Sequence, residues 1–446
     1  MAKIMIVVDH KWRDLPSSVY LKLLLEKNYG HSVELVRLGE DSALISSFMP
    51  HMVIYNNLYE KDRNEYARHL TSCGIKILIL PTEGITFSDQ QTLLFTHKYS
   101  GIDFIDCYLA WNSLMHNAIL ENNVLPESKV SLAGNCRFDF YLPPLSRLLK
   151  DRDYFFHKYG MPLHRMNILI TTNFANAEFW PDTSFLEKNL EKQRANGIPV
   201  FSDAAKLAQY EYEYRNMMFD LIIGFTKKQR GVNLLLKYHP SERKMLYQRF
   251  ADELKTLNPN VFLIEGEYIW DVLNVSDLTL QRCSTVAIEA WLMGKYTAEI
   301  ELLPSLDHFL QPKYREGSWT VKSVQDLSEL ISSISDNTLS ISQEMNTYRK
   351  KIIRELIFKP DGETSKRVAE TIDSLTREIH ADIRKLSGVT MKNRIKSFVR
   401  RTLGMKGYDI ASNLSKFKFG DYLGRYDKRF SADDVREWSE KLLPFL

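Results

Sequence analysis

Short apolar runs alternate with helical stretches along most of this chain, and this alternation restricts the possible folds more than any other feature. The first 145 residues contain six candidate strands: Ile4–Val8, Ser32–Leu38, Met52–Tyr55, Ile75–Leu80, Phe104–Trp111 and Val130–Ala133. Helical patterns lie between several of them: Ser17–Lys27, Glu65–Ser72 and Ser113–Asn122. Strands that alternate with helices predict a parallel sheet covered by helices on both faces.

A second series of the same kind follows a break at Leu142-Pro143-Pro144. Its candidate strands are Asn167–Thr172, Val232–Tyr238, Val261–Ile264 and Leu278–Gln281. Its candidate helices are Glu211–Lys228, Glu242–Lys255, Thr285–Met293, Val324–Ile334, Ser342–Leu356 and Ser365–Leu386. The segment Phe174–Tyr210 is less regular and suits a functional loop. A chain of 446 residues is also too long for one ordinary core. We therefore expect an α/β protein of two Rossmann-like domains facing a cleft, over residues 1–145 and 165–380.

The composition is that of a globular protein. Hydrophobic residues make up 44% of the chain and charged residues 26%. No apolar run reaches the roughly 18 residues that span a bilayer, and the first strand is too short for a signal peptide. The cysteines lack metal-ligand spacing, which argues against a zinc site or a disulfide scaffold and favours a reducing compartment. They are Cys73, Cys107, Cys136 and Cys283. These features predict a cytoplasmic protein.

The residues from 381 to 446 form a basic tail. From Ile383 to Leu446 there are 15 Lys and Arg against 7 Asp and Glu, although the whole chain carries only +3. Around Met391–Leu403, helical spacing places apolar side chains near one face and basic side chains toward the other. Two interpretations stay open. The tail is a helical extension that associates with an anionic membrane surface, or it returns and packs on the N-terminal domain.

Polar and cationic side chains follow two strands of the second series. The candidates are Lys237, His239, Arg282, Ser284, Thr285 and Glu289. Open α/β sheets bind ligands at the carboxyl ends of their strands. The two hydroxyl residues open a helix, whose first N–H groups and dipole favour an anion. The glutamate lies one helical turn further on, within reach of sugar hydroxyls beside that anion. This pattern is typical of half of a nucleotide-sugar site.

Six short motifs follow one another along the chain. They are Thr82-Glu83-Gly84, Ala133-Gly134-Asn135-Cys136-Arg137-Phe138-Asp139, Thr172-Asn173-Phe174, Lys237-Tyr238-His239-Pro240-Ser241-Glu242, Ser284-Thr285-Val286-Ala287-Ile288-Glu289-Ala290 and Asp361-Gly362. This ordered set resembles the surface-carbohydrate biosynthesis proteins of bacteria, which are GT-B glycosyltransferases. That family is similar to polysialyltransferases, capsule Kdo transferases and CDP-glycerol polymerases, in which a His-Pro motif and a Ser-Ser or Ser-Thr motif hold a cytidine nucleotide. The sequence departs from the pattern at Thr82, where polysialyltransferases carry an acid, and at Cys136, where relatives carry proline.

The resemblance implies an acceptor domain followed by a donor domain, and it implies roles for single residues. Glu83 would be the general base for the acceptor hydroxyl, and His239 would stabilise the departing phosphate. Substrate or nucleotide would be bound by Asn173, Lys237, Arg282, Ser284, Thr285 and Glu289. The loop from Gly266 to Trp270 would contact the base. If the enzyme retains the anomeric configuration, a carboxylate would be the nucleophile, and Glu178 and Asp203 are the candidates.

The expected reaction is glycosyl transfer in the synthesis of a bacterial capsule, O-antigen or lipopolysaccharide. The first choice of donor is CMP-Kdo and the second is CMP-sialic acid, with a glycan or lipid-linked acceptor at the inner face of the inner membrane. The alternatives are a UDP- or GDP-sugar transferase, a CDP-glycerol-type phosphotransferase and a non-catalytic GT-B scaffold. The sequence holds no DxD-like acidic pair, so we expect no obligatory metal. We also expect no cofactor beyond the nucleotide-sugar donor and no nucleic-acid partner.

Overall fold

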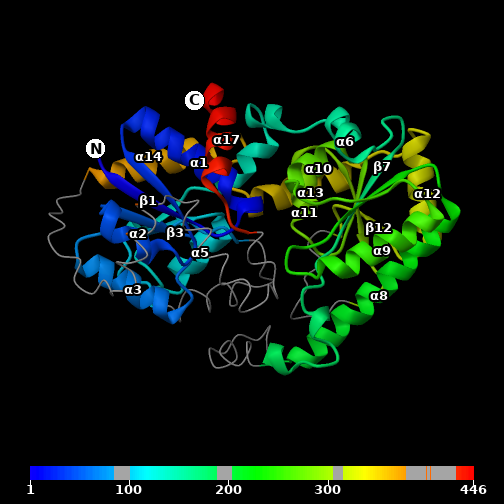
Figure 1. Ribbon diagram of the computed structural model, residues 1–446, viewed down its shortest axis with the longest axis horizontal. Coiled ribbons are helices and arrows are strands. Elements are labelled where there is room, and N and C mark those ends of the chain that lie inside the picture. Colours follow the sequence, from blue (N-terminus) through cyan, green and yellow to red (C-terminus); the bar gives the residue numbers. More distant parts are fainter. Residues whose placement is uncertain (85–100, 188–202, 305–314, 378–397, 399–401, 403–427) are drawn as a thin grey trace. The chain divides into compact units, whose positions relative to one another are not determined.

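The computed structural model describes residues 1–84, 101–187, 203–304, 315–377, 398, 402 and 428–446. The chain forms two compact units, shown in Figure 1. Unit 1 comprises Met1–Leu148 together with Arg354–Leu446, and unit 2 comprises Leu149–Ile353. Unit 2 thus begins before residue 165 and ends before residue 380, the limits expected from the sequence. The end differs because the helix at 364–376 packs on unit 1.

Unit 1 is built on a six-stranded parallel sheet in the order β2-β1-β3-β4-β5-β6. The strands are β1 (Lys3–Val8), β2 (Ser32–Arg37), β3 (Met52–Tyr55), β4 (Lys76–Ile79), β5 (Cys107–Ala110) and β6 (Val130–Leu132). The helices between them are α1 (Lys11–Tyr29), α2 (Asp41–Phe48), α3 (Lys61–Ser72) and α5 (Ser113–Glu121), and short 3-10 turns follow at Glu127–Lys129, Cys136–Tyr141 and Leu145–Leu148. Every residue of β3 and β5 is buried, as expected for strands with helices on both faces.

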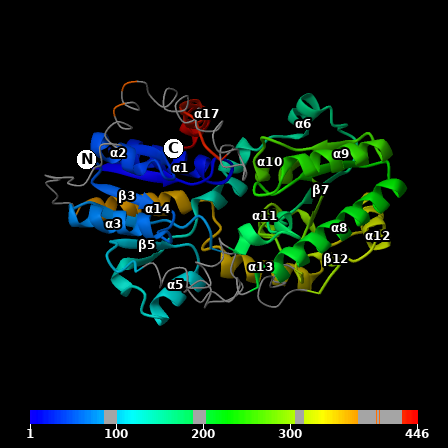
Figure 2. The same cartoon turned by 60° about the horizontal axis from the view of Figure 1, so that its bottom comes forward.

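The end of the chain returns to unit 1. Helices α14 (Thr364–Thr376) and α17 (Ala432–Leu442) both pack on α1, and they lie beside it in Figures 1 and 2. Asp139 accepts hydrogen bonds from the first N–H groups of α14, at Thr364 (3.0 Å) and Ser365 (2.7 Å). A carboxylate at this position also favours the positive end of the helix dipole. Residues 428–446 therefore follow the second interpretation of the tail, a return to the N-terminal domain.

Unit 2 is built on a second six-stranded parallel sheet, in the order β12-β11-β10-β7-β8-β9. The strands are β7 (Asn167–Thr171), β8 (Asn233–Lys237), β9 (Val261–Leu263), β10 (Leu278–Gln281), β11 (Tyr296–Ile300) and β12 (Trp319–Val321). The helices are α6 (Arg152–Tyr159), α8 (Ala204–Lys228), α9 (Lys244–Leu257), α10 (Ile269–Val275), α11 (Val286–Leu292), α12 (Val324–Ser335) and α13 (Gln343–Leu356), which crosses the boundary between the units in the sequence. A 3-10 turn lies at Ala177–Phe179. Counted from β7, this is the strand order of Rossmann folds.

The core of unit 2 lies between its sheet and α8. Met218, Ile222 and Phe225 recur at helical spacing on α8, and all three are buried in one cluster with Ile170 and Leu236 of the sheet. The helix begins at Ala204, seven residues before the predicted start. Asp203 explains the earlier start, because its carboxylate accepts a hydrogen bond from the Lys206 N–H (2.9 Å) and caps the helix.

The predicted basic helix Met391–Leu403 lies outside the described residues, apart from positions 398 and 402. Association with a membrane through this helix therefore stays a prediction. Among the helices that the structure does describe, none combines the length and the apolar character needed to cross a bilayer.

Gly362, in the last motif, shows how tightly the returning segment packs. Its φ is +80°, and a Cβ atom there would overlap the backbone carbonyl oxygen of Pro143. Gly30 is a matched control in the same unit, because its φ is +69° and its surroundings are open. We expect Gly30→Ala to lower the unfolding free energy by about 1 kcal/mol, the cost of left-handed backbone. Gly362→Ala should cost about 1–3 kcal/mol more because of overpacking, as measured by urea unfolding. Equal losses would contradict this account.

Candidate functional site

The candidate site lies at the carboxyl edge of the unit 2 sheet, where the strand order reverses beside β7. Ile170 of β7 lies opposite Leu236 of β8 on one side and Leu280 of β10 on the other. The chain leaves β8 and β10 at this same edge, and ligands of open α/β sheets bind at such a switch point. Of the predicted residues, Lys237 is the last residue of β8, and residues 173, 239, 282 and 284 follow the three strands.

The His-Pro motif forms a tight turn. The carbonyl oxygen of His239 accepts a hydrogen bond from the Glu242 N–H (2.9 Å), which closes a four-residue turn. Pro240 occupies its second position, where proline is favoured because its φ is already set. The Ser241 N–H donates to Nδ1 of the His239 ring (3.2 Å). The neutral ring therefore carries its proton on Nε2, and it lies exposed at the sheet edge.

Glu242 ties this turn to the loop that follows β7. The residue is only 6% exposed, and its carboxylate accepts the Thr172 hydroxyl (2.5 Å) and the Phe174 N–H. The Thr172 hydroxyl oxygen in turn accepts the His239 N–H (3.3 Å). Burial raises the pKa of Glu242, while the hydrogen bonds from Thr172 and Phe174 partly oppose that shift.

Arg282 and Asn173 join the ends of β10 and β7. The Asn173 amide donates to the Arg282 carbonyl oxygen (2.9 Å), and the Arg282 Nε donates to Asn173 Oδ1 (3.2 Å). Arg282 is only 3% exposed, and its guanidinium lies 4.6 Å from the ring centroid of Phe174 and 4.9 Å from that of Tyr214. Within the described part of the chain, no carboxylate forms an ion pair with Arg282, and its Nη1 has no hydrogen-bond partner. Two buried acids, Glu211 and Glu299, interact electrostatically with Arg282 without an ion-pair contact. The oxygens of Glu211 accept hydrogen bonds from Asn176.

The Ser-Thr motif lies at the start of α11. The Ser284 hydroxyl accepts the Val286 N–H (3.3 Å), which is an ordinary capping role at the start of a helix. Thr285 is the N-cap residue of α11, a helix of only seven residues. Glu289 is buried on this helix.

Glu299 of β11 holds the backbone just before this motif. Its carboxylate accepts the Cys283 N–H (2.7 Å) and the Gln281 side-chain amide (2.5 Å). Cys283 has a φ of +43°, a backbone conformation that needs such support. Burial raises the pKa of Glu299 to about 7, despite the opposing effect of these two hydrogen bonds.

Lys237 is turned toward the loop after β9. Its ammonium donates to the Glu267 carbonyl oxygen (2.7 Å), and burial lowers its pKa to about 8. The buried Glu267 carboxylate accepts from Lys150 (2.6 Å) and Lys158, so α6 also anchors this loop. The predicted base-contacting segment, Gly266 to Trp270, begins in this loop but ends inside α10.

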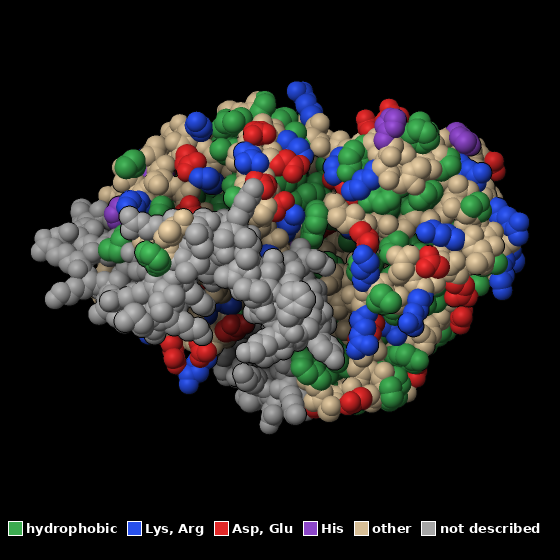
Figure 3. Space-filling view, in the orientation of Figure 1, with side chains coloured by type: hydrophobic (Ala, Val, Ile, Leu, Met, Phe, Trp, Pro, Cys, Tyr) green, Lys and Arg blue, Asp and Glu red, His purple; other side chains and the backbone are tan. Residues whose placement is uncertain are grey.

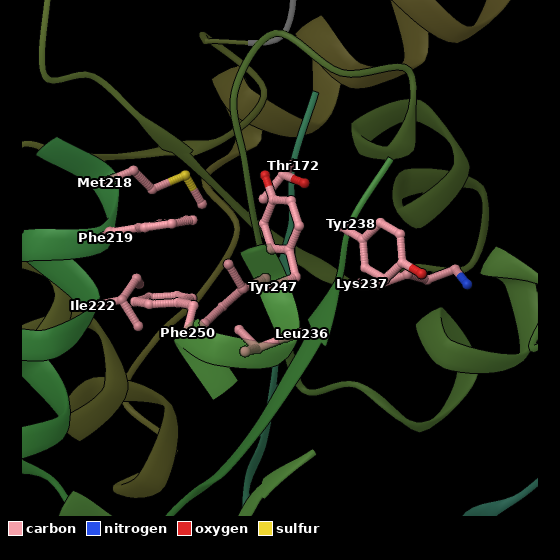
Figure 4. A pocket seen from close by; sticks show the side chains of 10 residues that line it. Thr172, Met218, Phe219, Ile222, Leu236, Lys237, Tyr238, Tyr247 and Phe250 are labelled. Atoms are coloured by element: carbon pink, nitrogen blue, oxygen red, sulfur yellow. The ribbon is translucent and has the colours of Figure 1, made fainter. Parts of the chain in front are cut away.

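A small cavity of about 10 Å³ lies beside β8, with room for about one water molecule. Figure 4 shows its aromatic wall of Phe219, Phe250 and Tyr247, with the hydroxyl end of Tyr247 beside Thr172. The Lys237 ammonium points away from these rings in the same view. Its size and its lining indicate a packing gap in the core, and this cavity is too small to hold a substrate.

The two candidate nucleophiles occupy structural positions. Glu178 is paired with Arg215 (2.7 Å) and Arg243 (3.1 Å). Asp203 is the N-cap of α8 described above. Their catalytic role in a retaining reaction stays a prediction.

In unit 1, Glu83 lies past the end of β4 with 52% of its side chain exposed. Its carboxylate accepts from Arg13 (2.7 Å), which also contacts Asp9 (2.9 Å) and Asp14 (2.8 Å). The Arg13 guanidinium further donates to the Thr82 hydroxyl (3.0 Å). Sequence reasoning missed Arg13, although its place five residues after β1, at the same sheet edge, was a usable signal.

Gly84 has a packing reason that the sequence did not reveal. A Cβ atom at this position would overlap the ring of Trp111, which follows β5. The absence of a side chain at Gly84 therefore allows the close packing of Trp111. On the face drawn in Figure 3, Lys and Arg side chains are interspersed with Asp and Glu side chains over the described surface. The described residues include no group of His, Cys, Asp and Glu suited to a metal ion.

Comparison with solved structures finds the same fold in proteins of low sequence identity. A candidate UDP-N-acetylglucosamine 2-epimerase from Listeria monocytogenes matches with a TM-score of 0.52 at 13% identity, over 84% of this chain and 97% of that one. S. aureus MnaA, in a co-structure with UDP, matches with a TM-score of 0.52 at 14% identity, over the same shares. No protein-family model and no curated protein matches this chain. These likenesses establish the fold, and they confirm the predicted class of two Rossmann-like domains of the GT-B type.

Glu299 gives a test of the electrostatics beside the Ser-Thr motif. Because its pKa is about 7 in the folded protein and ordinarily 4.5, the folded state binds the extra proton between these values. The stability that this proton supplies is complete below pH 4.5 and is lost as the pH rises through 7. A shift of this size corresponds to about 3 kcal/mol.

We therefore expect the unfolding free energy of the wild type, relative to Glu299→Gln, to fall by up to about 3 kcal/mol between pH 4.5 and 7.5. Urea unfolding of both proteins across this range measures the difference. A difference that stays constant with pH would show that Glu299 does not titrate there.

Proposed function

We propose that this protein binds a nucleotide sugar on unit 2 and transfers the sugar to a glycan or lipid-linked acceptor. The observation that carries the proposal is the guanidinium of Arg282, buried at the sheet edge without a carboxylate partner in the described part of the chain. A buried charge is costly unless an opposite charge compensates it. A phosphate group supplies that charge and fits the planar fork of guanidinium donors.

The residues at this edge suit the departure of a phosphate. Nδ1 of His239 accepts the Ser241 N–H, and in the proposed reaction the Nε2–H of the same ring donates to an oxygen of the leaving group. Asn173 orients Arg282 through its side-chain oxygen. As the bond from the anomeric carbon to the phosphate oxygen breaks, its electron pair stays on that oxygen, and these donors stabilise the added charge.

Glu83 is the proposed general base. The acceptor oxygen forms the new bond to the anomeric carbon, and its proton passes to the Glu83 carboxylate. The exposure of Glu83 leaves this carboxylate open to an acceptor, while Arg13 holds it on one side. We assign Ser284, Thr285 and Glu289 to the ribose and phosphate side of the donor.

The proposed donor is a CMP-linked sugar, with CMP-Kdo first, and the product a bacterial surface polysaccharide. This choice rests on the resemblance of the His-Pro and Ser-Thr motifs to cytidine-nucleotide enzymes. A UDP-sugar is the main alternative, because the fold matches S. aureus MnaA in its co-structure with UDP. Titration calorimetry with CMP, UDP and GDP separates these nucleotides, and tight binding of UDP alone would reject the cytidine assignment. Binding of none would leave the non-catalytic scaffold.

Arg282→Met tests the observation on which the proposal depends. The change removes the charge but keeps a long apolar side chain between the aromatic rings, so the fold should persist. We expect the affinity for the preferred nucleotide to fall at least about 10-fold, since hydrogen bonds to charged groups contribute about 1.5–3 kcal/mol. Calorimetry measures the change. Arg249→Met, at an exposed position on α9, is the control and should bind as the wild type does. An unchanged affinity in Arg282→Met would remove the phosphate-binding role.

Glu83→Gln tests the general base. The amide keeps the shape of the side chain but accepts no proton, so we expect transfer to fall about 100-fold or more while nucleotide affinity is unchanged. A coupled assay for nucleotide release, with an extract of bacterial glycolipids as acceptor, measures transfer. Interconversion of UDP-N-acetylglucosamine without any acceptor would instead identify an epimerase. Wild-type turnover in Glu83→Gln would exclude the proposed base.

A further inference from the structure

The carboxylate of Glu242 lies behind the His239 turn, and sequence reasoning gave it no role. It accepts the Thr172 hydroxyl and the Phe174 N–H, and the Thr172 oxygen accepts the His239 N–H. The main chain of Glu242 also closes the turn, through its N–H to the His239 carbonyl oxygen. One residue thus fixes His239 from both ends of the turn.

We propose that Glu242 is the positioning residue of His239, acting through the Thr172 hydroxyl to hold the imidazole in its Nε2–H form at the sheet edge. The catalytic consequence rests on the proposed function, in which that N–H faces the departing phosphate. The positioning itself rests only on the hydrogen bonds within unit 2.

The direction of each hydrogen bond follows from the chemistry of the groups. In its ionised form the Glu242 carboxylate has no proton to give, so the Thr172 hydroxyl donates to it. The hydroxyl oxygen then presents its lone pairs to the His239 N–H. An acid at position 242 therefore sets the orientation of the hydroxyl, and the hydroxyl sets the position of the His239 backbone.

The ring tautomer depends on the same turn. Nδ1 of His239 stays an acceptor only while the turn keeps the Ser241 N–H within 3.2 Å of it. If the anchor at Thr172 is lost, the turn is free to shift, and Nδ1 and Nε2 then compete for the proton. A glutamine at 242 does not replace the acid, because only one of its two polar atoms accepts a hydrogen bond, whereas both carboxylate oxygens of Glu242 accept one, from Thr172 and from Phe174.

Two pairs of variants separate positioning from simple loss of structure. Glu242→Gln removes one acceptor, and Glu265→Gln is its control, because Glu265 contacts Tyr238 and Lys244 instead of the turn. Thr172→Val removes the relay hydroxyl, whereas Thr172→Ser keeps it and should rescue. If Glu242→Gln fails to fold, the Thr172 pair decides the question.

The measurement is nitrogen NMR of the full-length protein labelled with ¹⁵N-histidine, with His239→Ala to assign the ring signals. We expect the wild type, Glu265→Gln and Thr172→Ser to show one protonated Nε2 and one unprotonated Nδ1 at neutral pH. In Glu242→Gln and Thr172→Val the two signals should move toward each other as the tautomers mix. Turnover in these two variants should fall about 100-fold, the cost of a misplacement of about 1 Å, with the nucleotide affinity within about 3-fold of the wild type.

Ring signals in Glu242→Gln and Thr172→Val that superpose on those of the wild type would overturn the proposal, whatever the activity. Mixed tautomers in a protein that binds no nucleotide would uphold the positioning and reject the proposed function. Mixed tautomers with wild-type turnover would show that the Nε2–H form has no part in the reaction, and would overturn the catalytic half of the proposal.

Discussion

The candidate site depends on the parallel pairing of β7 with β8 on one side and with β10 on the other. Because all three strands end at one edge, the residues that follow them meet there although they are far apart in the chain. Thr172 and Glu242 are 70 residues apart, and Asn173 and Arg282 are 109 apart. Each pair is joined by hydrogen bonds at the end of the central strand. The sheet therefore brings these residues close together, and the hydrogen bonds between them set their exact positions.

The buried charges at this edge are compensated in two different ways. Glu242 receives donors from Thr172 and Phe174, so its hydrogen-bonding capacity is largely used within the protein. Arg282 lies against the faces of Phe174 and Tyr214, which stabilise a cation without neutralising it. The first arrangement builds a rigid support. The second keeps a positive charge at the edge, and in the proposed function Arg282 is therefore the anion-binding group, whereas Glu242 holds the framework.

Much of the fold could be predicted, because most strands are uninterrupted apolar runs and the site residues directly follow them. β11 was missed because polar residues interrupt its pattern. Thr297 accepts the Trp291 indole N–H (2.8 Å) and Glu299 supports the Cys283 backbone, so both are buried for reasons that appear only in three dimensions. The support of His239 by Glu242 was missed for the same reason. Spacing along the chain identified the turn, but the partners of the carboxylate, Thr172 and Phe174, lie in the loop that follows β7.

The carboxyl edges of the two sheets also differ in the charges around one arginine in each, Arg13 in unit 1 and Arg282 in unit 2. Arg13 of unit 1 contacts the carboxylates of Asp9, Asp14 and Glu83, so this contact group carries more negative than positive charge. Burial alone would lower the pKa of Arg13, but the three carboxylates outweigh this effect and raise it. Arg13 therefore stays charged among them. A phosphate brought to this edge would meet an excess of carboxylates. Arg282 has no carboxylate in ion-pair contact among the described residues, and Lys237 ends the neighbouring strand β8, with His239 two residues further on. This contrast supports the proposed function, in which the anionic donor binds to unit 2 and Glu83 of unit 1 accepts a proton from the acceptor.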